Sequence, residues 1–184
     1  MTDSQVPPIR ILALSGSLQS SSSNTALLRL AANLADPGTV VDVFETLGEL
    51  PYFNPDLDVE PAPGAVADLR ARVGAADGVL IATPEYAHEM PGVLKNALDW
   101  LVSSGELYSK PVAVLAAAPS PERGIYARAA VERTLDAEGA RMLHSTTVAV
   151  VRSSQVGEPP VEVVNSVARA LQSLGGGVES HIQL

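Results

Sequence analysis

The stretch that decides the fold is Ile9–Thr25, which reads IRILALSGSLQSSSSNT. Its first six residues, five of them apolar, have the length of one buried strand, and a helical pattern of apolar residues follows from Asn24. A turn rich in serine joins the two. It places small hydroxyl and amide groups beside the free N–H groups of a helix start, where the helix dipole also favours an anion. We therefore expect a phosphate-binding turn here.

The composition of the turn excludes two common phosphate motifs. No lysine follows in the pattern G-x-x-x-x-G-K-[ST], so a nucleoside triphosphate site with magnesium is not expected. The spacing also departs from G-x-G-x-x-G, which argues against a dinucleotide. A phosphate held by neutral donors alone suits flavin mononucleotide (FMN). Taken in isolation, the serine run leaves open a second interpretation, in which it only caps the helix.

Apolar strands and amphipathic helices alternate along the rest of the chain. We expect strands over residues 9–14, 40–44, 78–83, 112–117 and 146–151, and helices over 24–35, 64–75, from Pro91 as a first helical position, 125–138 and 161–174. Strands that are apolar on both sides indicate a parallel sheet covered by helices on both faces. The prediction is an α/β, flavodoxin-like, doubly wound five-stranded parallel sheet in the order 2-1-3-4-5, forming a single domain over residues 1–184.

Composition narrows the choice of partners. The chain has 184 residues, and 12 basic against 21 acidic side chains give a net charge of −9, which argues against nucleic acid and against an anionic membrane surface. It has no cysteine, and its three histidines lack metal-ligand spacing, so no metal site is expected. No apolar run reaches about 18 residues and no secretory leader pattern is present, so the expected location is cytoplasmic.

A second motif follows the third expected strand. Residues Ala82–Trp100 read ATPEYAHEMPGVLKNALDW. Together with Gly16-Ser17-Leu18 and Ser22-x-Asn24, this segment resembles the NADPH-dependent FMN reductase family, which has a G-S-L-R-x-x-S-x-N turn and a P-E-Y-N-x-x-x-P-G-x-L-K-N-A-x-D-W segment. The loop Leu50–Leu57 also resembles that of the family, so the likeness covers nearly the whole chain.

The resemblance implies an enzyme in which hydride passes from NADPH or NADH through FMN to a small acceptor such as a flavin, quinone or azo compound. It also implies a homodimer or homotetramer. No catalytic side chain is expected, because the cofactor carries the chemistry. The implied residues near the FMN phosphate are Ser15, Ser17, Gln19, Ser22, Asn24 and Thr25; those beside the flavin ring, mainly through backbone amides, are Pro84, Glu85, Tyr86, Ala87 and His88.

Three departures from the family pattern affect the site. Gln19 stands where the family has arginine, which removes a positive charge expected near the FMN phosphate or the nucleotide's ribose phosphate. Ala87-His88 replaces Asn-Gly, so an imidazole is brought toward the acceptor. After the fourth strand, only Gly124 remains of a Gly-Gly pair, and Arg123 is the nearest positive charge for a nicotinamide nucleotide phosphate.

The remaining polar residues of the second motif have simpler interpretations. Glu85 and Glu89 are expected to be solvated loop charges and not a carboxylate pair. Asn96 and Trp100 share a helix face and are expected to pack. Two rival functions stay open: a non-enzymatic FMN-binding protein for electron transfer or redox-responsive interaction, and a domain that binds a phosphorylated small molecule without flavin.

Overall fold

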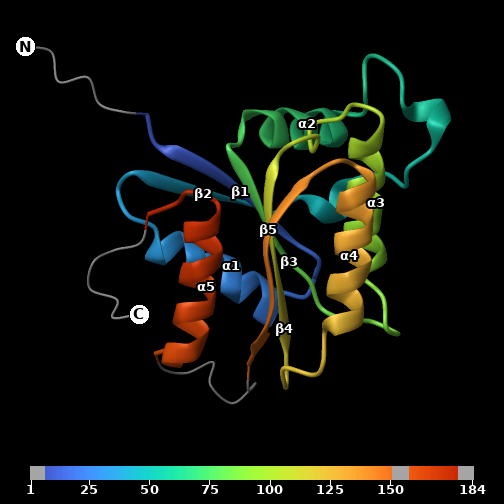
Figure 1. Ribbon diagram of the computed structural model, residues 1–184. Coiled ribbons are helices and arrows are strands. Elements are labelled where there is room, and N and C mark those ends of the chain that lie inside the picture. The colour runs from blue at the N-terminus through green and yellow to red at the C-terminus, as the bar shows by residue number, and fades with distance from the viewer. Residues whose placement is uncertain (1–6, 151–157, 178–184) are drawn as a thin grey trace, which may run out of the picture.

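The predicted sheet is confirmed by a computed structural model, which describes residues 7–150 and 158–177. All strand pairs are parallel and the order is β2-β1-β3-β4-β5 (Figure 1). The strands are β1 (Ile9–Ser15), β2 (Thr39–Phe44), β3 (Gly78–Ala82), β4 (Pro111–Ala118) and β5 (Arg141–Ala149).

Helices cover both faces of this sheet, as predicted. Helices α1 (Ser23–Leu34) and α5 (Val161–Ser173) lie on one face, and α3 (Gly92–Val102) and α4 (Ile125–Ala137) lie on the other (Figure 1). Helix α2 (Gly64–Ala75) packs into the same apolar cluster as α3 and α4. Two short 3₁₀ turns, η1 (Leu47–Glu49) and η2 (Pro55–Leu57), follow β2.

Alternation along the central strands divides the core in two. Leu12, Ile81 and Val114 point to the cluster under α2, α3 and α4, whereas Leu80 and Leu115 point to the cluster under α1 and α5. Because side chains alternate between the faces of a sheet, both sets must be apolar for both faces to be covered. This explains why these strands read as unbroken apolar runs.

The structure corrects two predicted boundaries. Strand β5 begins at Arg141 and not at Thr146, because an edge strand alternates exposed and covered residues and shows no continuous apolar run. Its predicted last residue, Val151, lies outside the described residues. Pro91 is not the first helical residue: its ψ of 142° is extended, so it caps the helix and α3 begins at Gly92.

The loop after β2 is held by helix α3. The Asn96 side chain accepts a hydrogen bond from the Phe53 N–H at 2.7 Å and donates one to the Pro51 carbonyl at 3.0 Å. The buried Trp100 indole donates to the same carbonyl at 2.8 Å. Asn96 and Trp100 therefore pack as expected and also fix this loop.

Within the described part of the chain, no helix has both the length and the apolar character needed to cross a bilayer.

Candidate functional site

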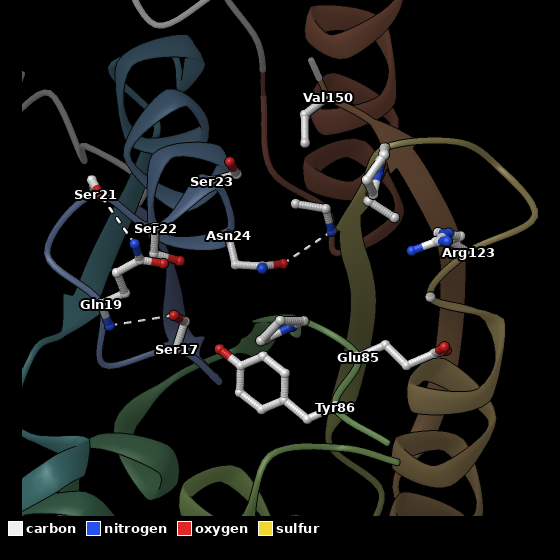
Figure 2. Close-up of a pocket in the computed structure, with 15 residues that line it drawn as sticks. Ser17, Gln19, Ser21, Ser22, Ser23, Asn24, Glu85, Tyr86, Arg123 and Val150 are labelled. Carbon is white, nitrogen blue, oxygen red and sulfur yellow. Dashed lines mark hydrogen bonds between the residues drawn. The ribbon is translucent and has the colours of Figure 1, made fainter. Parts of the chain in front are cut away.

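A cleft of about 580 Å³ opens at the carboxyl edge of the sheet, where β1, β3 and β4 end (Figure 2). Open parallel sheets bind ligands at this edge, at the point where the chain switches from adding strands on one side of the first strand to adding them on the other. In this sheet that point lies between β1 and β3. The cleft is lined by Ser17, Gln19, Ser21, Ser22, Ser23, Asn24, Pro84, Glu85, Tyr86, Ala117, Ala118, Pro119, Arg123, Gly124 and Val150.

One wall of the cleft is the turn between β1 and α1. Gly16 brings this turn against β3: its N–H donates to the Ala82 carbonyl at 2.8 Å, and a Cβ there would lie 3.2 Å from the Thr83 hydroxyl oxygen. The Ser22 hydroxyl caps α1 by accepting from the Thr25 N–H at 3.3 Å. The capping interpretation therefore holds for Ser22 itself, and the capped helix start still faces the cleft.

Asn24 connects this wall to β4. Its side chain is only 4% exposed, and its Oδ1 accepts a hydrogen bond from the Ala117 N–H at 2.9 Å (Figure 2). The Nδ2 group is therefore the donor that Asn24 has left for a ligand. Ser15 and Thr25 lie outside the cleft lining, with their hydroxyl oxygens 2.8 Å apart, and brace the turn internally.

The outer part of the wall is neutral. The Gln19 N–H donates to the Ser17 hydroxyl at 3.3 Å, and its side-chain amide donates to the Ser21 hydroxyl at 3.2 Å. Gln19 thus stands at the cleft, where the family has arginine, and contributes an amide without a charge. The lining residues of this wall offer hydroxyl, amide and backbone N–H donors only.

The second wall is the loop between β3 and α3. Tyr86 and Glu89 exchange two backbone hydrogen bonds of 3.0 Å, and the residues between them, Ala87 and His88, have φ values of +51° and +61°. Positive φ at both central positions defines a type I′ turn, for which Asn-Gly is the favoured pair. Ala87 and His88 lie outside the cleft lining, and the His88 ring stacks on Tyr126 with centroids 4.5 Å apart.

Glu85 is not the solvated loop charge that the sequence suggested. Its carboxylate Oε2 accepts hydrogen bonds from the N–H groups of Tyr126 at 2.9 Å and Ala127 at 3.2 Å, in the first turn of α4. Helix α4 has Gly124 at its N-cap and no side-chain cap of its own. A helix start that lacks a Ser, Thr, Asp or Asn cap needs an acceptor from elsewhere, and this was the signal that sequence reasoning missed.

The third wall joins β4 to α4. Gly124 has a φ of +83°, and a Cβ on it would lie 3.0 Å from the Ala116 Cβ, so glycine suits this corner. Sequence reasoning noted this loop but did not assign the lining residues Ala117 and Ala118 at the end of β4, Pro119 after it, or Val150 after β5. Their position at the carboxyl ends of strands four and five was the available signal. Tyr86, which lines the cleft and is 56% exposed, lies across the cleft from Val150 (Figure 2).

The charges of the site are few. Among the described residues that line the cleft, Glu85 is the one carboxylate and Arg123 the one cation. Glu85 is engaged at the start of α4, so the described lining residues include no carboxylate or imidazole that is free for acid–base work. Within the described residues, no cluster of three or more His, Cys, Asp or Glu side chains suits a metal.

The sequence from β1 to β5 agrees with this geometry. A model of the NADPH-dependent FMN reductase family matches residues 9–155. The chain belongs to this family. The match includes both the β1–α1 turn and the β3–α3 loop, so the two walls predicted from the sequence lie within the matched residues.

Named relatives and solved structures extend the comparison. An NAD(P)H-dependent FMN reductase of Pseudomonas aeruginosa is 42% identical over 111 residues, which are 59% of this chain and 60% of that protein. A quinone reductase of Escherichia coli K12 is 34% identical over 109 residues, 58% of each protein. The chain thus spans less than two thirds of either relative's length. The structure of FerB, a flavoenzyme NAD(P)H:(acceptor) oxidoreductase from Paracoccus denitrificans, superposes with a TM-score of 0.77 at 24% identity, covering 91% of this chain and 99% of FerB.

Proposed function

We propose that this chain is an FMN-dependent NAD(P)H oxidoreductase that passes hydride from a nicotinamide nucleotide through FMN to a small acceptor, such as a flavin, quinone or azo compound. The observation that carries this proposal is the cleft at the carboxyl edge of the sheet. It combines a neutral, donor-rich helix start on one wall with a backbone loop on the other. The P. aeruginosa and E. coli relatives, named as FMN and quinone reductases, support it.

The residues present fit FMN. The 5′-phosphate would lie at the start of α1, among Ser17, Gln19, Ser22 and the Nδ2 group of Asn24, where free N–H groups and the helix dipole favour an anion. The flavin ring would lie beside Pro84, Glu85 and Tyr86. A cleft of about 580 Å³ is within the usual size of a cofactor site.

When bound, FMN supplies the acceptance and the donation of hydride; the protein's part is to bind and orient. The β3–α3 loop is held in place because Glu85 and His88 attach it to α4. Of its residues that line the cleft, Pro84 has no N–H group and the Tyr86 N–H donates to the Glu89 carbonyl. The Glu85 N–H is therefore the backbone donor that this loop would offer to a ring that gains negative charge, which would stabilise the reduced form without a side-chain acid. Tyr86 would cover the ring or position the acceptor.

An absorbance experiment tests the function. The purified protein is mixed with FMN, desalted, and treated anaerobically with NADPH or NADH. Flavin bands that are retained and then bleach support the proposal. Retained bands that do not bleach favour a non-enzymatic flavin-binding protein, and a protein that retains no flavin and binds none on titration contradicts the proposal in favour of another phosphorylated ligand.

We further propose that the chain forms a homodimer or homotetramer and works in the cytoplasm. A groove of about 640 Å³ between α3 and α4, lined in part by Met90, Val102 and Ala137, supports assembly with a second copy. Light scattering of the purified protein measures the assembly. The use of a nicotinamide nucleotide and the absence of cysteine from the sequence support the location, which cell fractionation tests.

A further inference from the structure

The loop between β4 and α4 carries an unpaired positive charge at the cleft. Arg123 is exposed and lines the cleft, and its backbone N–H donates to the Ser120 carbonyl at 3.1 Å. Within the described part of the chain, its guanidinium has neither an ion pair nor a hydrogen bond. Arg70 and Arg72, by contrast, each pair with an aspartate, at 2.7 Å and 3.1 Å.

The wall opposite Arg123 is neutral. Ser17, Gln19 and Ser22 lie on the β1–α1 side of the cleft, and Arg123 lies on the β4–α4 side (Figure 2). The cleft therefore has one end suited to an anion held by neutral donors and another end with a free cation. Two phosphate-bearing molecules that share the cleft would meet these two ends separately.

The start of α4 does not compete with Arg123 for an anion. The Glu85 carboxylate already accepts from the N–H groups of Tyr126 and Ala127 and offsets the positive end of the helix dipole. The chain as a whole carries a net charge of −9, which repels a polyanionic nucleotide. At this end of the cleft, the attraction for an anion rests on Arg123.

We propose that Arg123 binds the 2′-phosphate monoester of NADPH and thereby makes the protein prefer NADPH to NADH. The inference rests on the proposed function, because it requires FMN to occupy the neutral end of the cleft. A phosphate monoester is also present in FMN, so the two sources must be distinguished. NADH lacks the 2′-phosphate, and a guanidinium forms paired hydrogen bonds with phosphate oxygens.

Calorimetric binding of two fragments to the FMN-loaded protein tests this assignment. The probes are adenosine 2′,5′-bisphosphate, which has the 2′-phosphate, and 5′-AMP, which lacks it. In the Arg123→Gln variant we expect affinity for the bisphosphate to fall roughly tenfold or more while affinity for 5′-AMP is unchanged, since a hydrogen bond to a charged group is lost. The Arg123→Lys variant should recover part of the loss. KM for NADPH, but not for NADH, should rise in parallel.

The control is Arg141→Gln, which removes an exposed arginine at the opposite edge of the sheet, where β5 begins. It should leave both affinities unchanged. Equal weakening of both probes in Arg123→Gln, or no weakening of either, overturns the assignment. Weaker binding of FMN with unchanged binding of the bisphosphate also overturns it, because Arg123 then serves the flavin phosphate. Since the binding assay needs no turnover, a protein that binds FMN but fails to oxidise NADPH contradicts the proposed enzyme and still gives a result for Arg123.

Discussion

The carboxylate of Glu85 accepts a hydrogen bond from the backbone N–H of Tyr126, with 2.9 Å between oxygen and nitrogen. This contact joins the β3–α3 loop, which forms one wall of the cleft, to the first turn of α4. A second contact runs in parallel, since the His88 ring stacks on that of Tyr126. The conformation of the proposed flavin loop and the integrity of α4 are therefore coupled, and one side chain carries much of the coupling.

Replacing Glu85 with alanine should weaken both elements. We expect Glu85→Ala to lower the free energy of unfolding by about 1–2 kcal/mol, because two N–H groups lose their acceptor and the helix dipole loses its counter-charge. Urea unfolding measures this loss, and FMN titration should show weaker binding. Glu85→Gln keeps an acceptor oxygen and should be intermediate in both measurements.

Glu89 provides a matched control on the same loop. It is exposed, accepts from the Met90 N–H at 3.1 Å and pairs with Arg133 at 3.9 Å on the surface. An exposed ion pair contributes about 0–1 kcal/mol, so Glu89→Ala should change unfolding little. Equal effects of Glu85→Ala and Glu89→Ala would show that the contact with α4 is unimportant.

The turn at Ala87 and His88 stores strain that substitution should release. Ala87 has a φ of +51°, a left-handed conformation that costs a non-glycine residue about 1 kcal/mol. Ala87→Asn should stabilise the protein by about 0.5–1 kcal/mol, because asparagine tolerates this conformation and suits the first central position of a type I′ turn. Thermal unfolding should show a rise of roughly 2–4 °C per kcal/mol for a chain of this size.

The same substitution elsewhere should have the opposite sign. Ala71 is exposed in the middle of α2, where asparagine is a poorer helix former than alanine. Ala71→Asn should therefore lower the melting temperature. A rise with Ala71→Asn, or a fall with Ala87→Asn, would contradict the strain argument.

Glu138 should make stability depend on pH. Its two carboxylate oxygens are buried and have no hydrogen-bond partner among the described residues. Burial, and after it the negative charge of Asp99, raises the pKa of Glu138 to about 8. Glu106 adds to this rise in pKa and Lys95 opposes it. The unfolded chain releases this proton near its ordinary value of 4.5, whereas the folded chain keeps it. This group's contribution to stability is therefore present at low pH and is lost as pH rises from about 4.5 to 8.

Glu138→Gln removes that titration while keeping the shape of the side chain. Because the group is partly open to solvent, we expect the variant to be more stable than the parent by about 1–3 kcal/mol at pH 8.5, with the difference shrinking toward pH 5. Urea unfolding of both proteins across this range measures the difference. A gap that stays constant with pH would mean that Glu138 ionises normally.

Features set by residues close together in the sequence could be predicted, and contacts between residues far apart in the sequence could not. The parallel sheet, both helix layers and the first wall of the cleft follow from local patterns: apolar runs that alternate with helices and a serine-rich turn directly after β1. The strand order came from the fit of these elements to the flavodoxin-like fold, and the second wall came from the resemblance to the family. The start of β5 was wrong because an edge strand carries no continuous apolar signal. The contact of Glu85 with α4 spans more than 40 residues of sequence and was not predicted, since the sequence marks an uncapped helix but not the residue that caps it.

Asn24 should serve both the fold and the ligand, and two substitutions separate these roles. Asn24→Ala leaves the half-buried Ala117 N–H without its acceptor and should cost about 1 kcal/mol of stability as well as FMN affinity. Asn24→Asp keeps an acceptor oxygen for Ala117 but replaces the Nδ2 donor with negative charge. Because the new charge lies in the first turn of α1, where the helix dipole offsets it, the variant should unfold near the parent's urea midpoint. It should nevertheless bind FMN roughly tenfold more weakly or worse, because like charges repel strongly at a buried site. Riboflavin, which has no phosphate, is the matched ligand: its affinity should be the same for Asn24→Asp and the parent. If Asn24→Asp weakens riboflavin as much as FMN, the side chain faces the flavin and not its phosphate.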